Sequence, residues 1–197
     1  MKKFSLFFLS ILFCITSVFA ADNGTISGAE SIIWAGIDFS QVKMIGPDFN
    51  KPDEIFPGML EKWNGLFLKE KIITLTKDLK KKIVLDVECT RIVNKDTSAS
   101  QIFVSPGPED GINKTHITDA IIAKQVNSYK MVSKSGIGLV FIVDRFVKLE
   151  EKGAVYVVYF DVATRKVISS KREVNSAAGF GFRNYWFRVI KKISVGI

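Results

Sequence analysis

Histidine and cysteine are almost absent from this chain, which contains one histidine, His116, and two cysteines, Cys14 and Cys89. Protein zinc sites take three or four ligands, mostly from these two residue types, so the composition excludes a site of that kind. Oxygen ligands for Ca²⁺ or Mg²⁺ remain open at 108–113, where carboxylates occur without the spacing of a calcium-binding loop. A phosphate-binding loop is also missing, since the glycines at 133–139 precede a strand pattern and do not open a helix. We therefore expect neither a metal nor a cofactor.

Long apolar runs are confined to the first twenty residues. Two lysines precede an apolar stretch over 4–19, and Val18 and Ala20 occupy the positions that a signal peptidase reads. The stretch is shorter than the about twenty apolar residues of a membrane anchor. The pattern predicts a cleaved signal peptide over residues 1–20, with the mature chain beginning at Ala21. We expect a periplasmic or secreted protein without a stable membrane span.

Removal of that segment leaves 177 residues, enough for one domain over 21–197 with its own core. The net charge is +8 for the full chain, and the loss of Lys2 and Lys3 brings it to +6. A mildly basic exported protein fits the anionic polymers or lipids of an envelope, and no basic cluster forms a nucleic-acid motif. Cys14 leaves with the signal peptide, and the large residues before it do not make a lipid-attachment site. Cys89 is then alone, so the fold depends on its core and not on a disulfide.

Hydrophobic periodicity predicts alternating strands and helices followed by a run of strands. Three β-rich segments between 137 and 174 are joined by short turns, which predicts an antiparallel meander whose first two strands are covered on both faces. The third segment is more polar and is expected near an edge. The other predicted elements are strands at 31–46 and 83–93, a helix at 56–71, a helix capped by Thr115 or Thr118, and a last helix over 182–193. This order indicates an α+β fold: a mixed, largely antiparallel sheet with a C-terminal three-strand meander and helices packed on it.

The segments GLVFIVDRFV and VYVVYFDVATRKVISSKREV, at 138–147 and 155–174, resemble an α/β domain of bacterial envelope proteins. That domain is shared by the curli-secretion channel subunit, the lipoprotein activators of penicillin-binding proteins and the amino-terminal domain of the Tol translocation protein. Its hairpin often carries Asp-x-x-Thr-Gly at the turn; Asp161 and Thr164 match, and Arg165 stands where glycine would permit a positive φ. The resemblance covers about two thirds of the mature chain and rests on topology more than on motif. It implies an envelope location and protein–protein contact, and it implies no catalytic residues.

Four aspartates lie within predicted strands among apolar neighbours: Asp38, Asp86, Asp144 and Asp161. If two of them shared a pocket, repulsion and desolvation would separate their pKa values and supply the acid and the base of a glycosidase-type hydrolase. The alternative is that each faces solvent or pairs with a nearby arginine, and no common spacing ties them together. His116 is expected at the start of a helix, as an exposed or capping residue.

Cys89 shares the apolar face of its predicted strand with Ile83, Leu85 and Val87, which indicates a small core side chain. Arg91 falls on the same face. A reactive thiol therefore remains the alternative, since a positive neighbour lowers the pKa of a thiol.

The most aromatic stretch of the chain is SAAGFGFRNYWFRVI, at 176–190. Steps of four, three and four residues put Phe182, Trp186, Val189 and Ile193 on one helical stripe, which we expect in the core. Outside the stripe remain three aromatic residues and an arginine: Phe180, Tyr185, Phe187 and Arg183.

Exposed neighbouring aromatic side chains are unfavourable on a soluble surface unless something covers them. We therefore expect these four residues to form a partner-facing patch, with cover by the loop before the second helix as the alternative. The sequence favours an exported, non-enzymatic protein that binds another envelope component, either protein or polymer. The alternatives are a secreted hydrolase that uses strand carboxylates, and a peripheral binder of anionic membrane or cell-wall polymer.

Overall fold

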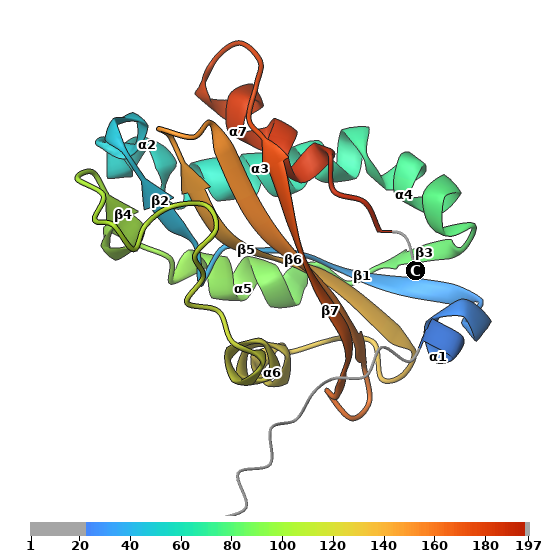
Figure 1. Cartoon of the computed structure of the whole chain (residues 1–197). Coiled ribbons are helices and arrows are strands. Elements are labelled where there is room, and N and C mark those ends of the chain that lie inside the picture. The colour runs from blue at the N-terminus through green and yellow to red at the C-terminus, as the bar shows by residue number, and fades with distance from the viewer. Residues whose placement is uncertain (1–22, 196–197) are drawn as a thin grey trace, which may run out of the picture.

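The structure, a computed structural model, describes residues 23–195, so the predicted signal peptide and its cleavage at Ala21 lie outside the described residues. Within them, one seven-stranded sheet carries helices on both of its faces (Figure 1). No helix in this part of the chain is both long enough and apolar enough to cross a bilayer. The elements are α1 Asn23–Gly28, β1 Ser31–Asp38, β2 Lys43–Ile45, η1 Pro47–Phe49, α2 Pro52–Ile55, α3 Gly58–Glu70, α4 Ile72–Leu79, β3 Lys82–Leu85, α5 Glu88–Lys95, η2 Ala99–Gln101, β4 Ile102–Phe103, α6 Asp119–Ser128, β5 Ile137–Val147, β6 Lys152–Asp161, β7 Val167–Ser176 and α7 Phe182–Lys191.

Strand β5 is the centre of the sheet, and the strands on its two sides run in opposite senses. β1 and β2 follow one another along one side of β5, parallel to it. β3 pairs with β1 and β4 with β2, again in parallel. On the other side β6 is antiparallel to β5, and β7 is antiparallel to β6. The fold is therefore α/β, with five parallel strands and a C-terminal antiparallel meander. The predicted α+β class with a largely antiparallel sheet is wrong, although the predicted meander is present.

The error has a physical origin in the connections between strands. Apolar alternation along a strand is the same whether its neighbour is parallel or antiparallel, so the connection decides the direction. Helices α3 and α4 return the chain between β2 and β3, and α6 lies between β4 and β5. Each of these crossovers lets the next strand run in the same direction as the last. Only the short turns after β5 and β6 can be read directly as reversals.

Two predicted strands are shorter than expected. The segment 31–46 forms β1 and β2, with a turn between them at 39–42. The segment 83–93 leaves the sheet after β3 and continues as α5. Cys89, Thr90 and Asn94 are the buried residues of α5, and their spacing is helical.

The core forms two apolar layers, one on each face of the sheet. The larger layer joins α3, α4 and α7 to one face of β5 and β6, and the smaller joins α6 and Cys89 to the other face. Every residue of β5 is buried, and β7 is a more exposed edge strand, both as predicted. The Thr118 side chain accepts a hydrogen bond from the backbone N–H of Ile121 at 3.3 Å, so Thr118, and not Thr115, caps α6.

Candidate functional site

The strand aspartates have separate partners. Asp38 ends β1 fully buried and accepts hydrogen bonds from the Tyr129 hydroxyl at 2.6 Å and from the Ser40 backbone N–H at 2.7 Å. Burial raises the pKa of Asp38. Asp86 follows β3 and accepts from the backbone N–H of Ser133 at 2.7 Å. Each carboxylate is thus used to fix local backbone or a core tyrosine.

Asp161 closes the turn between β6 and β7. It accepts from the backbone N–H and the hydroxyl of Thr164, at 2.7 and 2.8 Å, and these bonds lower the pKa of Asp161. Arg165, in the same turn, has φ +61°, which is the conformation that glycine favours at such a position. Within residues 23–195, no hydrogen bond or ion pair joins any two of Asp38, Asp86, Asp144 and Asp161.

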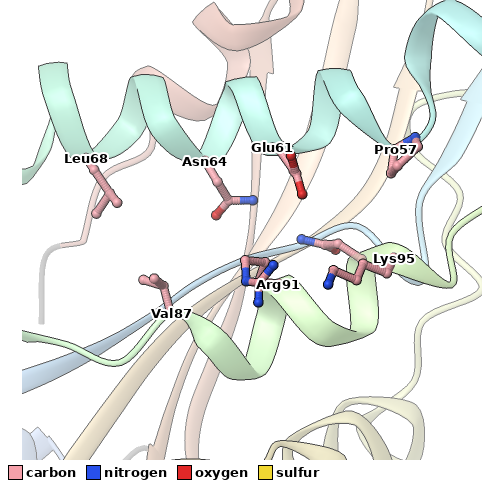
Figure 2. A pocket seen from close by; sticks show the side chains of 8 residues that line it. Pro57, Glu61, Asn64, Leu68, Val87, Arg91 and Lys95 are labelled. Atoms are coloured by element: carbon pink, nitrogen blue, oxygen red, sulfur yellow. The ribbon is translucent and has the colours of Figure 1, made fainter.

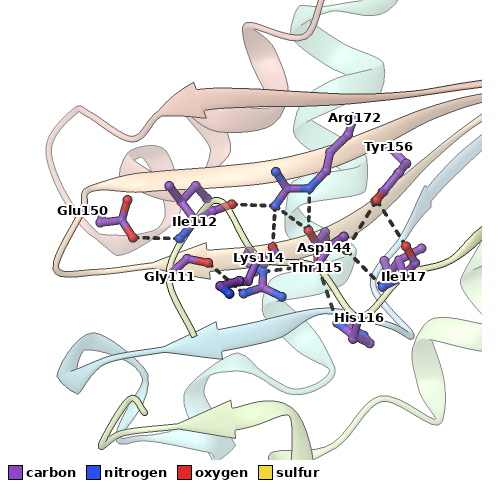
Figure 3. A network of polar contacts seen from close by, with 11 residues as sticks. Gly111, Ile112, Lys114, Thr115, His116, Ile117, Asp144, Glu150, Tyr156 and Arg172 are labelled. Carbon is purple, nitrogen blue, oxygen red and sulfur yellow. Dashed lines mark hydrogen bonds and ion pairs between the residues drawn. The ribbon is translucent and has the colours of Figure 1, made fainter. Parts of the chain in front are cut away.

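Asp144 is fully buried at a bulge of β5 and lies between two arginines (Figure 3). Its Oδ2 accepts from Arg172 Nε at 2.8 Å, and its Oδ1 from Arg145 Nε at 3.3 Å. The same arginines donate to backbone carbonyls in the segment 111–114, at 2.7, 2.9 and 3.0 Å. This network fastens the loop before α6 to the sheet. The Asp144 carboxylate thus accepts from two guanidinium groups as part of this structural network.

His116 lies beside this network, partly buried, with its Nδ1 3.6 Å from Asp144 Oδ1. It is neither fully exposed nor a helix cap, so the prediction of an exposed or capping residue is wrong. Burial lowers the pKa of His116 and favours the neutral ring. A nucleophile–histidine–acid site would need a hydroxyl poised for attack. The neighbouring Thr115 hydroxyl accepts from the Ile117 N–H at 3.0 Å and lies 3.4 Å from the Tyr156 hydroxyl, so it belongs to the loop's own hydrogen bonds.

Cys89 is buried on α5, which confirms the core interpretation but places the residue on a helix and not on a strand. Burial, with a smaller contribution from the charge of Asp86, raises the pKa of the thiol to about 12. A thiol that stays protonated at neutral pH is a poor nucleophile. In the part of the chain that the structure describes, no group of three or more His, Cys, Asp or Glu side chains is arranged to hold a metal ion.

The predicted aromatic patch is divided between surface and core. Phe180 is 96% exposed in the loop before α7, whereas Phe187 is 3% exposed. The assignment of Phe187 to a partner-facing patch is therefore wrong. Of the predicted stripe, Trp186, Val189 and Ile193 are buried, whereas Phe182 is half-buried and packs against the same core.

The other two residues of the patch lie at the base of the loop. Tyr185 is half-buried and meets Trp186 edge-on, with ring centroids 5.2 Å apart. Lys148 Nζ lies 4.5 Å from the centre of the Tyr185 ring. The Arg183 side chain is exposed, and its backbone carbonyl accepts from the Trp63 indole N–H at 2.8 Å, which ties α7 to α3.

A cleft of about 340 Å³, which the sequence did not reveal, lies between α3 and α5 (Figure 2). Residues three or four positions apart share one face of a helix, and one such face of each helix is turned toward the other helix. The residue just before each helix, Pro57 or Val87, continues that face. The lining residues are Pro57, Glu61, Asn64 and Leu68 on one wall, and Val87, Arg91, Asn94 and Lys95 on the other. The sequence did not indicate the second wall because its segment alternates apolar and polar residues like a strand.

The floor of the cleft is the outer edge of β1, beyond the point where β3 ends. β3 pairs with β1 only as far as Trp34, so the following backbone groups have no strand partner on that side. Asn64 accepts from the Ile37 N–H at 3.0 Å and donates to the Ile37 carbonyl at 3.2 Å. Asn94 donates to the same carbonyl at 2.8 Å and accepts from the Phe39 N–H at 2.7 Å. Two side-chain amides thus take the place of a neighbouring strand.

Helix α5 approaches this edge so closely that a glycine is required at position 36. The Thr90 hydroxyl donates to the Ala35 carbonyl at 2.6 Å. Gly36 has φ +102°, and a Cβ there would collide with the Thr90 hydroxyl. Side chains from two helices therefore hold the floor of the cleft in one geometry.

Comparison of the chain with models of known protein families, with curated proteins and with solved structures finds no match. The resemblance to the bacterial envelope domain therefore stays a prediction from the residues that carry it.

Proposed function

We propose that this chain is an exported, non-enzymatic protein that binds another protein of the cell envelope through the loop before α7. The observation that carries the proposal is Phe180, which is 96% exposed between Gly179 and Gly181. Exposed apolar surface is unfavourable by about 25 cal/mol per Å². A large aromatic side chain held in solvent is therefore a candidate anchor for a pocket on a partner. The predicted signal peptide supports the export half of the proposal.

The loop presents Phe180 on a backbone that is fixed by hydrogen bonds. The Asn184 side-chain amide donates to the Phe180 carbonyl at 3.3 Å, and the Tyr185 N–H donates to the Gly181 carbonyl at 3.0 Å. Gly179 and Gly181 have φ values of +120° and +76°, which residues with side chains rarely adopt. Since the loop is already ordered, binding would lose little conformational entropy.

A second exposed apolar side chain lies in the neighbouring turn. Leu149 is 74% exposed in the β5–β6 turn at 148–151. The Ala177 N–H donates to the Glu151 carbonyl at 2.7 Å, so the turn and the loop are joined. We call this combined region the loop-tip surface and define it by Leu149, Phe180, Arg183 and Tyr185.

Charges of both signs surround the loop-tip surface. Lys148 pairs with Asp48 at 3.2 Å and with Glu151, in the same turn as Leu149, at 4.0 Å. An anionic bilayer or polymer would attract the lysine and repel the carboxylates. The mixed rim therefore favours a protein partner that has an apolar pocket and charges of both signs around it.

The test begins with photo-cross-linking from p-benzoylphenylalanine incorporated at position 180, in cells that export the protein. The captured protein is then purified, and calorimetry gives the Kd of its complex with the wild type and with each variant. We expect Phe180→Ala to weaken binding by at least about tenfold and to leave the Tm unchanged. The matched control is Ile73→Ala, which removes an apolar side chain that is 66% exposed on α4 and should leave the Kd unchanged.

Two results would refute the proposal. One is an equal Kd for the wild type and Phe180→Ala with the captured protein. The other is cross-linking to lipid together with Phe180-dependent binding to phosphatidylglycerol vesicles, which would assign the loop-tip surface to a membrane.

A further inference from the structure

The cleft between α3 and α5 has no part in the loop-tip surface, since none of that surface's residues lines it. Its volume of about 340 Å³ is within the range of small-molecule sites. Figure 2 shows Leu68 and Val87 facing one another at one end, and Glu61, Lys95 and Pro57 toward the other. The cleft therefore has an apolar end and a charged end.

Three charged side chains define the charged end. Among the described residues, Glu61 on α3 and Lys95 on α5 have no ion-pair partner, although they belong to opposite walls. Arg91 is held from outside the cleft by Glu88, which accepts from its Nε at 2.6 Å and from its Nη2 at 2.5 Å. A guanidinium has five N–H donors, so Arg91 keeps others for a ligand.

The polar floor offers one further donor. Asn94 is 4% exposed and lines the cleft. A side-chain amide has two N–H donors, and in the described part of the chain only one of them, the donor to Ile37, has a partner. The second N–H of this amide can therefore donate to a ligand oxygen in the cleft.

We propose that this cleft binds a small zwitterion of the amino-acid type with an aliphatic side chain. Its carboxylate accepts from Lys95, Arg91 and the free Asn94 N–H, and its ammonium pairs with Glu61. Its aliphatic group packs between Leu68 and Val87. Glu61 repels a ligand that carries only a carboxylate, and the two cations repel one that carries only an amine. Only a ligand with both charges satisfies both walls.

The test measures calorimetric binding of three probes of similar size to the full mature chain. L-leucine has both charges, leucinamide lacks the carboxylate, and isocaproate lacks the ammonium. We expect saturable leucine binding and at least about tenfold weaker binding of each analogue, because each loses a charge-assisted contact. Lys95→Met and Glu61→Gln should each weaken leucine binding by at least about tenfold. The matched control Lys69→Met changes an exposed lysine of α3 outside the cleft and should leave the Kd unchanged.

Absence of saturable leucine binding up to about 10 mM would overturn the proposal. So would equal affinities for leucine and isocaproate, because Glu61 would then select nothing. Lys95 and Glu61 are exposed, so their variants should fold with an unchanged Tm, and a loss of binding reports on the site. Phe180→Ala should bind leucine like the wild type, so this proposal and the proposed function can fail independently.

Discussion

Asn94→Ala tests whether side-chain amides close the interrupted edge of β1. The variant removes the acceptor of the Phe39 N–H, at 2.7 Å, and a donor to the Ile37 carbonyl, at 2.8 Å. Phe39 is fully buried, so its N–H is left without an acceptor from the protein. The Ile37 carbonyl keeps its bond from Asn64 at 3.2 Å and contributes less to the loss.

The expected magnitude follows from these two groups. A buried polar group left without its partner destabilises a protein by about 1–3 kcal/mol. With a smaller loss at the second group, Asn94→Ala should lower the free energy of unfolding by about 2–4 kcal/mol. For a chain of this size that corresponds to a fall in Tm of about 5–15 °C.

The assay is urea unfolding followed by tryptophan fluorescence, with amide exchange of Phe39 as a local readout. The midpoint should fall while the slope with urea stays constant, since the folded state remains as compact. The matched control is Asn127→Ala on α6, where the side chain donates to the Ala123 carbonyl at the surface. That change should alter the free energy of unfolding by less than about 0.5 kcal/mol.

The reasoning is refuted if Asn94→Ala and Asn127→Ala lose the same free energy, or if the Phe39 amide exchanges equally slowly in the wild type and Asn94→Ala. Asn94→Asp supplies a second comparison. It keeps an acceptor for Phe39 but turns a carboxylate oxygen toward the Ile37 carbonyl. It should therefore be at least as destabilising at neutral pH as Asn94→Ala.

Two further predictions concern buried ionisable groups. The folded pKa of Asp38 is raised, so the folded state keeps its proton at pH values where the unfolded chain has lost it. Wild-type stability should therefore decline as the pH rises from about 4 through the folded pKa of Asp38. Asp38→Asn should lack this part of the decline. Urea midpoints of the two proteins that stay parallel from pH 4 to pH 8 would contradict this prediction. Cys89→Ser should lower the free energy of unfolding by about 1–2 kcal/mol, because it places a hydroxyl in an apolar site. Burial raises the pKa of Cys89 to about 12, so the folded wild type should not react with a disulfide reagent at pH 8, and fast labelling without denaturant would contradict the assignment.

The meander and the central strand were predictable because their signals are local. Every residue of β5 is buried, and its sequence is apolar on both faces with a short polar turn after it. The direction of β1 to β4 was not predictable in the same way, since it depends on crossover helices and not on the strands themselves. The change from strand to helix after Leu85 was hidden because alternate residues there are apolar. Thr90 and Asn94 face a strand edge that exists only once the chain has folded.

The errors within the aromatic stretch and the omission of the cleft have related causes. A four-residue stripe describes a helix with one buried side, but α7 packs against both the sheet and α3, so Phe187 and Ile190 are buried beside the stripe. Glu61 and Lys95 look like ordinary exposed charges on two separate segments. Only the placement of α3 and α5 on the two sides of the open edge of β1 puts them on opposite walls of one cleft.

The open edge of β1 and the cleft have a common origin. A free strand edge invites pairing with other chains. Here a further strand paired with β1 beyond the end of β3 would fill the space of the cleft. Asn64 and Asn94 satisfy the edge without occupying that space, so closure of the sheet and an open site are compatible. Asn94→Ala should then lower both the stability and the affinity for a cleft ligand. Lys95→Met should leave the Tm of the free protein unchanged. It should reduce only the stability that the bound ligand adds, which for the wild type is about 2.7 kcal/mol at a ligand concentration of a hundred times Kd.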